Sequence, residues 1–129
     1  MTGTASEQPK RILIIDDEEM IRESLSMILE LNGYRVDSTG EGSAAIEKIR
    51  TTAYSLLLLD LNMPGFSGID VLRELNRMRY CVPIVVFTGF GSPATEQTCT
   101  QLGASAFLGK PVPIPELLEL VRNLIDRSD

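Results

Sequence analysis

Histidine is absent from this 129-residue chain, and so is tryptophan. Without histidine the chain lacks the commonest general base and the commonest metal ligand of proteins. It also cannot form the Ser-His or Cys-His pairs that activate a nucleophile. Any chemistry must therefore use carboxylates, hydroxyls, lysine, thiols or a bound hard cation.

Cysteine is scarce, and long apolar runs are missing. Cys81 and Cys99 match neither metal-binding Cys-x-x-Cys spacing nor a secreted disulfide framework, so we interpret both as reduced thiols in a cytoplasmic protein. Residues 1–9 are polar and lack the apolar core of a signal peptide, and no apolar stretch approaches the length of a membrane span. We predict a flexible leader over residues 1–9 and a single domain over residues 10–129.

Acidic residues outnumber basic residues by 18 to 12, which gives a net charge of −6. A negative domain repels nucleic acid and anionic lipid unless a local basic patch intervenes. We therefore predict no direct nucleic-acid partner and no membrane partner for the domain.

Five short apolar segments recur along the chain, and each is followed by residues with helical periodicity. The segments at 12–15, 56–59 and 84–87 are apolar throughout, which is typical of parallel strands buried on both faces. Weaker segments lie at 35–36 and 106–108. Strict alternation of strand and helix indicates an α/β fold. We predict a doubly wound, five-stranded parallel sheet in the flavodoxin-like order 2-1-3-4-5 with five helices.

Several predicted helix ends carry sequence signals. Ser67 followed three residues later by Asp70 is typical of a capping box, and Ser92-Pro93 is typical of an N-cap followed by proline in the first turn. Gly33 is predicted to cap the end of the first helix. The helix that begins near Ser92 has the least apolar face, so we expect it to be held most loosely.

Polar residues follow the strands at their carboxyl ends. In a 2-1-3-4-5 sheet the first and third strands are neighbours at the switch point, where ligands bind. Asp16 and Asp17, after the first strand, should therefore converge with Asp60, which ends a run of leucines. Thr88 after the fourth strand and Lys110 after the fifth would complete the rim.

Each of these polar residues has an ordinary structural explanation when taken alone, such as a strand-end cap, an acid at a helix start or a solvated lysine. Three carboxylates together are different, because two such charges about 5 Å apart repel by roughly 3 kcal/mol at an effective dielectric near 20. A divalent cation removes that repulsion, and an all-oxygen ligand set favours Mg²⁺. With a lysine and a hydroxyl, the site suits phosphoryl transfer to a carboxylate, which gives an aspartyl phosphate.

The motifs ILIIDDEE, LLLLDLNMPG, FTG and GKP, in that order at the predicted strand ends, resemble the response-regulator receiver domain of two-component signalling. Each motif alone is weak, but the set is specific and covers nearly the whole chain. The resemblance implies a phosphorylation-activated switch that accepts a phosphoryl group on Asp60 in the presence of Mg²⁺. Asp17 would bind Mg²⁺ directly, Asp16 would act mainly through a water molecule, and Asn62 would offer its backbone carbonyl. Lys110 would pair with Asp60 and then with the phosphoryl group.

The resemblance also implies how the signal is transmitted. Thr88 would move to hydrogen-bond the phosphoryl oxygen, and Phe107, in the place of the family's switch aromatic, would then swing inward. A shift of the fourth helix and fifth strand would follow. The Lys110-Pro111 bond is expected to be cis. Phe107 lacks a tyrosine hydroxyl, and Val112 replaces a frequent phenylalanine, so the output face departs from the family pattern.

The implied partners are a histidine kinase or a histidine phosphotransfer protein as donor, and a downstream effector protein or domain. The chain would catalyse only its own phosphoryl transfer and dephosphorylation, either as a stand-alone regulator or as the receiver part of a longer one. Three other functions fit the sequence less well. A haloacid-dehalogenase-type phosphatase would carry its acid pair last and an acid-base residue where Asn62 stands. A flavin carrier would not place acids at its phosphate loop, and an interaction module that is never phosphorylated would not retain the full set of polar residues.

Overall fold

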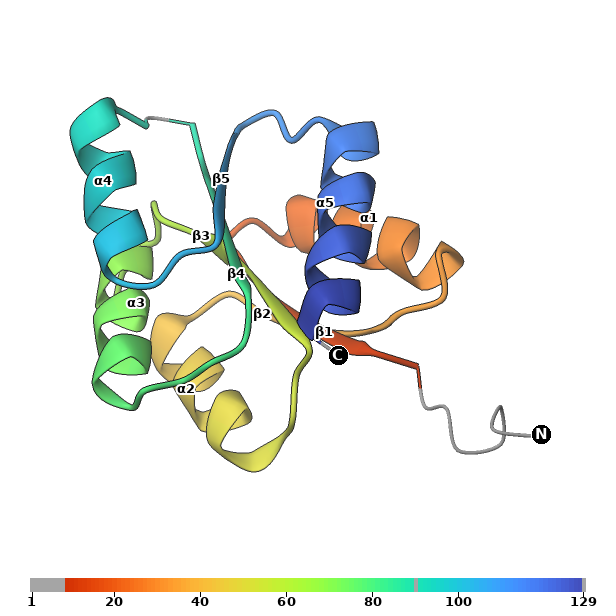
Figure 1. Ribbon diagram of the computed structural model, residues 1–129, viewed down its shortest axis with the longest axis horizontal. Helices are drawn as coiled ribbons and strands as arrows, with labels where there is room; N and C mark the ends of the chain where they lie inside the picture. Colours follow the sequence, from red (N-terminus) through yellow and green to blue (C-terminus); the bar gives the residue numbers. More distant parts are fainter. Residues whose placement is uncertain (1–8, 90, 129) are drawn as a thin grey trace.

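The computed structural model describes residues 9–89 and 91–128, so nearly all of the predicted leader lies outside the described residues (Figure 1). Strands and helices alternate strictly, which confirms the predicted α/β class. The elements are β1 (Arg11–Ile15), α1 (Glu19–Leu31), β2 (Arg35–Thr39), α2 (Gly42–Thr51), β3 (Leu56–Asp60), α3 (Gly68–Arg77), β4 (Ile84–Thr88), α4 (Pro93–Gln101), β5 (Ala106–Gly109) and α5 (Ile114–Ser128).

The five strands form one parallel sheet in the order β2-β1-β3-β4-β5, which confirms the predicted order. Helices α1 and α5 cover one face, and α2, α3 and α4 cover the other (Figure 1). Within the described part of the chain, no helix is both long enough and apolar enough to cross a membrane.

The unbroken apolar runs reflect burial on both faces of the sheet. In β3, Leu57 and Leu59 pack with α2 and α3, whereas Leu56 and Leu58 pack with α1 and α5. All four leucines are fully buried. Because both faces are covered, successive side chains must all be apolar, and the alternating pattern of a half-exposed strand is absent.

The strands extend beyond their predicted apolar cores. β2 continues to Thr39, and Asp60 and Thr88 are themselves the last residues of β3 and β4. Backbone hydrogen bonding continues through polar residues, which an apolar pattern does not register. Ile15 pairs with Leu59, so the next residues, Asp16 and Asp60, come to lie side by side at the carboxyl edge.

The predicted helix starts are confirmed. Ser67 Oγ accepts a hydrogen bond from the Asp70 backbone at 3.3 Å, and the Asp70 carboxylate accepts one from Ser67 N at 2.9 Å, which completes the capping box. Ser92 caps α4 through its side chain alone, because its Oγ accepts the Thr95 N–H at 3.1 Å. The predicted helix stop is displaced by one residue, because Asn32 is the C-cap of α1 and Gly33 follows with a left-handed φ of 93°. As expected from its weak apolar face, α4 buries only Cys99 among its side chains.

Candidate phosphoryl-transfer site

Three carboxylates meet at the carboxyl edge of the sheet, as the sequence predicted. Asp16, Asp17 and Asp60 each offer an oxygen, and these atoms all lie within 4.8 Å of one another. Asp16 and Asp60 are buried and Asp17 is exposed. The cluster therefore opens to solvent on the side of Asp17.

Main-chain hydrogen bonds fix the acids. The Asp16 amide donates to Thr39 O at 3.0 Å, which continues the sheet by one residue beyond β1. Asp16 Oδ1 accepts the Glu18 N–H at 2.8 Å, and Asp60 Oδ1 accepts the Asn62 N–H at 3.1 Å. Each buried carboxylate therefore uses one oxygen to shape the loop that follows it and leaves the other oxygen directed at the site.

Lys110 is the cation of the site. Its ammonium lies 3.1 Å from Asp16 Oδ2, 3.4 Å from Asp60 Oδ2 and 3.3 Å from Glu18 Oε1. The Phe87 ring lies beneath it, 5.4 Å away. The Lys110 backbone is held by a 2.9 Å hydrogen bond to Thr88 O, and the Lys110-Pro111 bond is cis, as expected.

Burial and the neighbouring charges shift the pKa values of Asp60 and Lys110. Burial raises the pKa of Asp60, and the neighbouring Asp16 raises it further, against the lowering effects of the Asn62 amide and Lys110. Burial lowers the pKa of Lys110, but its hydrogen bond to Asp16 and the charges of Asp16 and Asp60 more than offset this, so that its pKa is raised. The ammonium is held in its charged form beside carboxylates that repel one another.

The donor set fits a hard divalent cation. Asp16 Oδ2 is a buried oxygen, and within residues 9–89 and 91–128 the one positive charge beside it is the Lys110 ammonium, 3.1 Å away. A cation held by Asp16, Asp17 and Asp60 would satisfy that oxygen and remove the repulsion among the acids. Oxygen ligands without imidazole or thiolate are those that Mg²⁺ takes in proteins.

Thr88 and Phe107 lie beside the acid cluster, on β4 and β5. The Asn62 side-chain amide donates a hydrogen bond to Thr88 Oγ1. A Cβ added to Gly91 would lie 2.9 Å from Phe107 Cε1 and 3.2 Å from Thr88 Cγ2, so both side chains abut the Gly91 backbone. A hollow of about 340 Å³ reaches from Thr88 past Phe107 to Lys110. The two predicted switch residues are therefore neighbours.

Two participants were not predicted from the sequence. Glu18 stands at the N-cap position of α1 but makes no side-chain cap, and instead reaches Lys110. The side chain of Asn62 bonds Thr88, whereas only its backbone carbonyl was assigned a role. Residues Asp16 to Glu19 form an unbroken acidic run, and nothing in the run distinguishes the acid that meets a lysine 92 positions away.

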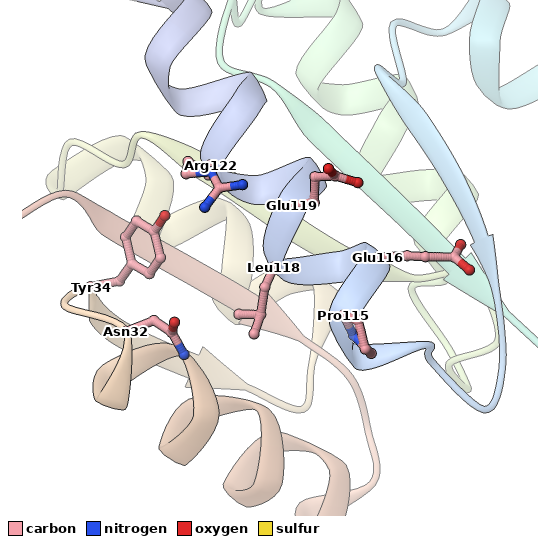
Figure 2. A pocket seen from close by; sticks show the side chains of 7 residues that line it. All are labelled: Asn32, Tyr34, Pro115, Glu116, Leu118, Glu119 and Arg122. Atoms are coloured by element: carbon pink, nitrogen blue, oxygen red, sulfur yellow. The ribbon is translucent and has the colours of Figure 1, made fainter.

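One pocket lies away from this chemistry. It has a volume of about 560 Å³ and lies between the end of α1 and α5. Figure 2 shows the Tyr34 ring beside the Arg122 guanidinium, and Leu118 also lines the pocket. None of the predicted site residues lines it. We assign the chemistry to the acid cluster because the charged groups converge there.

The chain resembles known proteins over most of its length. The family model of the response regulator receiver domain matches residues 12–122. Response regulator MprA of Mycobacterium ulcerans is 36% identical over 118 residues, which are 92% of this chain and 51% of that protein. Response regulator RR06 of Streptococcus pneumoniae is 35% identical over 116 residues, covering 90% and 53%. The chain thus spans about half the length of these curated relatives.

Solved structures agree with this result. A CheY-like response regulator receiver domain protein from Methanospirillum hungatei has a TM-score of 0.88 at 31% identity, covering 93% of this chain and 96% of that one. Response regulator TrrA from Thermotoga maritima, in complex with Mg²⁺ and BeF, has a TM-score of 0.80 at 34% identity, covering 89% and 98%. These matches support the predicted class of a phosphorylation-activated switch rather than a conventional enzyme. The chain belongs to the family of response-regulator receiver domains.

Proposed function

We propose that Asp60 is the phosphoacceptor of this switch. The observation that carries the proposal is the position of Lys110, whose ammonium lies 3.4 Å from Asp60 and 3.1 Å from Asp16. A fixed cation beside a buried carboxylate neutralises the charge of a transferring phosphoryl group. Asp16 and Asp17 complete a ligand set for Mg²⁺, to which Asn62 would add its backbone carbonyl.

The reaction is an in-line transfer. A carboxylate oxygen of Asp60 attacks phosphorus, the P–N bond of a phosphohistidine breaks, and the imidazole leaves with the bonding electron pair and takes up a proton. The product is a mixed anhydride of Asp60 and phosphate. Mg²⁺, when bound, supplies positive charge to the phosphoryl oxygens. Lys110 exchanges its contact with the carboxylate for one with the phosphoryl group.

Loss of the phosphoryl group resets the switch. Water attacks phosphorus, the bond from phosphorus to the Asp60 oxygen breaks, and inorganic phosphate leaves. Asn62 stands two residues after Asp60, and an amide at that position cannot exchange a proton with the attacking water as a carboxylate would. The phosphorylated form therefore lives longer than the intermediate of a phosphatase, which favours a switch over the haloacid-dehalogenase alternative.

Transmission begins at Thr88. Its hydroxyl would turn to the phosphoryl oxygen and vacate space beside Phe107, whose ring adjoins the hollow of about 340 Å³. The neighbouring helix, α4, buries a single side chain, so it has few packing contacts to hold it in place. Movement of α4 and β5 would present the changed surface to an effector protein or domain.

The donor would be a histidine kinase or a histidine phosphotransfer protein, since this chain has no histidine of its own. An apolar groove of about 320 Å³ borders Lys110 and is lined by Ile21, Leu25, Pro111 and Val112. Met20, 79% exposed, lies at its edge. An apolar surface beside the phosphoacceptor suits a transient protein partner that must bring its phosphohistidine to Asp60. The acidic domain is expected to act in the cytoplasm, without direct contact with nucleic acid or membrane.

Intact-protein mass spectrometry tests the proposal. The chain is incubated with acetyl phosphate, with and without Mg²⁺, and is compared with Asp60→Asn and with the matched variant Asp126→Asn, whose carboxylate is exposed on α5. We expect a Mg²⁺-dependent gain of one phosphoryl group, labile to hydroxylamine, in the wild type and in Asp126→Asn only. Phosphorylation of Asp60→Asn would assign the acceptor elsewhere.

A further inference from the structure

Arg22, the fourth residue of α1, lies against the main chain of the acid cluster. Its Nη1 donates a 2.8 Å hydrogen bond to the carbonyl of Asp16. That carbonyl belongs to the peptide unit that joins Asp16 to Asp17. On the other side of the same residue, the Asp16 amide donates to Thr39 O at 3.0 Å. The main chain of Asp16 is therefore held by β2 at its amide and by Arg22 at its carbonyl.

The guanidinium has no other partner among residues 9–89 and 91–128. Arg22 is half-buried and forms no ion pair there. Arginines that stabilise a surface usually do so by pairing with a carboxylate, and acidic residues surround Arg22 on α1. Here the Arg22 guanidinium donates instead to one backbone oxygen, that of Asp16. An arginine that served only solubility would not need this directed contact.

Gly40, just after β2, leaves the space that Arg22 occupies. A Cβ at position 40 would lie 2.8 Å from Arg22 Nη1 and 3.6 Å from Asp16 O. The φ of Gly40 lies outside the left-handed region, unlike that of Gly33 or Gly65. Backbone conformation therefore does not require glycine at this position. What the missing side chain provides is room for the guanidinium to reach the carbonyl.

We propose that Arg22 is a positioning residue for the divalent-cation site, acting through the peptide between Asp16 and Asp17, and that Gly40 keeps its path open. The inference rests on the proposed function of the acid cluster. The orientation of that peptide sets the direction in which the Asp17 side chain leaves the main chain, and Asp17 is the exposed acid that faces an entering cation. Loss of the hydrogen bond would let the peptide rotate and separate the carboxylates.

The charge of Arg22 and its proposed positioning role predict opposite changes in Mg²⁺ affinity when Arg22 is replaced. Arg22→Met removes a positive charge near a cation site, so charge alone would make Mg²⁺ bind more tightly. If Arg22 positions the acids, the same variant binds Mg²⁺ more weakly, by roughly tenfold, as is typical when a group that orients a metal ligand is removed. Methionine retains the aliphatic stem, which limits the packing change. Arg35→Met, exposed at the start of β2, is the matched control and should leave the affinity unchanged.

A double mutant tests whether Gly40 affects Mg²⁺ binding through Arg22. Gly40→Ala should also weaken Mg²⁺ binding, because its methyl group displaces the guanidinium. Since the displaced group is absent in Arg22→Met, adding Gly40→Ala to that variant should cost nothing further, so the two effects are not additive. A methyl group that acted on the fold directly would weaken binding equally in both backgrounds.

The affinity is measured by titrating MgCl₂ into each folded protein at 25 °C and following backbone amides by NMR. The Asp17 amide reports directly, because its peptide carries the bonded carbonyl, and it should shift in Arg22→Met before any Mg²⁺ is added. Unchanged or tighter Mg²⁺ binding by Arg22→Met, with additive effects of Gly40→Ala, would overturn the proposal for Arg22. Failure of the wild type itself to bind Mg²⁺ would instead overturn the proposed function of the cluster.

Discussion

The Asn62 side chain donates a hydrogen bond to the Thr88 hydroxyl, and so joins the loop after β3 to the last residue of β4. Asn62 is two residues from the proposed phosphoacceptor, and Thr88 is buried beside it. The loop that follows the proposed phosphoacceptor and the proposed switch residue Thr88 are therefore connected in the unphosphorylated protein. A phosphoryl oxygen on Asp60 would accept a hydrogen bond from the Thr88 hydroxyl, and this would favour a different orientation of the hydroxyl from the one that the Asn62 amide holds.

Asn62→Ala should loosen Thr88 without preventing phosphorylation. The variant removes the amide that donates a hydrogen bond to Thr88 Oγ1. We therefore expect the Thr88 side chain to sample additional χ1 rotamers and the protein to lose about 1 kcal/mol of stability. Three-bond couplings to the Thr88 methyl group measure the rotamers, and urea unfolding measures the stability. Asn76→Ala, on the exposed face of α3, is the control. An unaltered Thr88 rotamer in Asn62→Ala would show that other contacts fix the hydroxyl.

Asp60→Asn should stabilise the metal-free protein. Burial, reinforced by Asp16, raises the pKa of Asp60 despite the ammonium of Lys110, so the folded state disfavours the ionised carboxylate. A neutral isostere removes that cost, and we expect a gain on the order of 1 kcal/mol near pH 7 without Mg²⁺. Chemical denaturation in the presence of a chelator measures it.

Addition of Mg²⁺ should reverse this order. The wild type gains stability by binding the cation, whereas Asp60→Asn has lost one of three carboxylates and gains less. Asp126→Asn, exposed on α5, should follow the wild type under both conditions. Equal stability of the wild type and Asp60→Asn without Mg²⁺ would mean that the carboxylates do not repel one another as the structure indicates.

The sequence was sufficient to predict the sheet order and the meeting of Asp16, Asp17, Asp60, Thr88 and Lys110, because parallel strands bring their carboxyl ends to one edge whatever the side chains do in detail. It was not sufficient to predict the partners of those side chains. The contact of Glu18 with Lys110 spans 92 positions and depends on where a flexible lysine places its ammonium. Helix and strand limits were missed by one or a few residues, since hydrogen bonding continues through Thr39, Asp60 and Thr88.

The sequence also could not predict which glycines allow two backbone segments to approach each other closely. Gly68 begins α3, and a Cβ there would lie 2.3 Å from the backbone oxygen of Asp60. Nothing in the motif distinguishes a glycine that a turn requires from one that allows two backbones to approach. Only the positions of both backbones separate these roles.

Gly68→Ala should therefore disturb the loop that follows Asp60, the proposed phosphoacceptor. The methyl group would overlap the Asp60 carbonyl and come within 2.6 Å of Leu61 Cα, so the start of α3 must move away from β3. We expect a loss of about 1–3 kcal/mol, typical of overpacking, and slower phosphorylation by acetyl phosphate. Gly109→Ala is the matched control, because nothing lies within 4 Å of a Cβ at that position. Equal behaviour of the two variants would show that α3 yields without cost.

Tyr54 offers a test of the fold that is independent of the acid cluster. Its hydroxyl, in a side chain only 6% exposed, donates to Asp37 Oδ2 at 2.7 Å, and Arg11 holds the same carboxylate at 3.2 Å. Burial, together with the hydrogen bond to Asp37, raises the pKa of Tyr54 from 10.0 to about 12. The folded state therefore favours the protonated phenol over the phenolate.

The raised pKa of Tyr54 makes the stability of the protein fall at high pH. Because the pKa of Tyr54 is higher in the folded state, its contribution to stability is complete below pH 10 and is lost as the pH rises towards 12, with a total loss on the order of 2 kcal/mol. Tyr54→Phe should be less stable by about 1 kcal/mol at pH 7, since it lacks the hydrogen bond to Asp37. The stability difference between the two proteins should then shrink as the pH rises above 10 and reverse sign before pH 12, because only the wild type has this phenol to ionise. Urea unfolding of both proteins across that range measures the difference, and the other titrating groups, common to both, cancel. Parallel stability curves up to pH 12 would show that Tyr54 ionises as readily in the folded protein as in the unfolded chain.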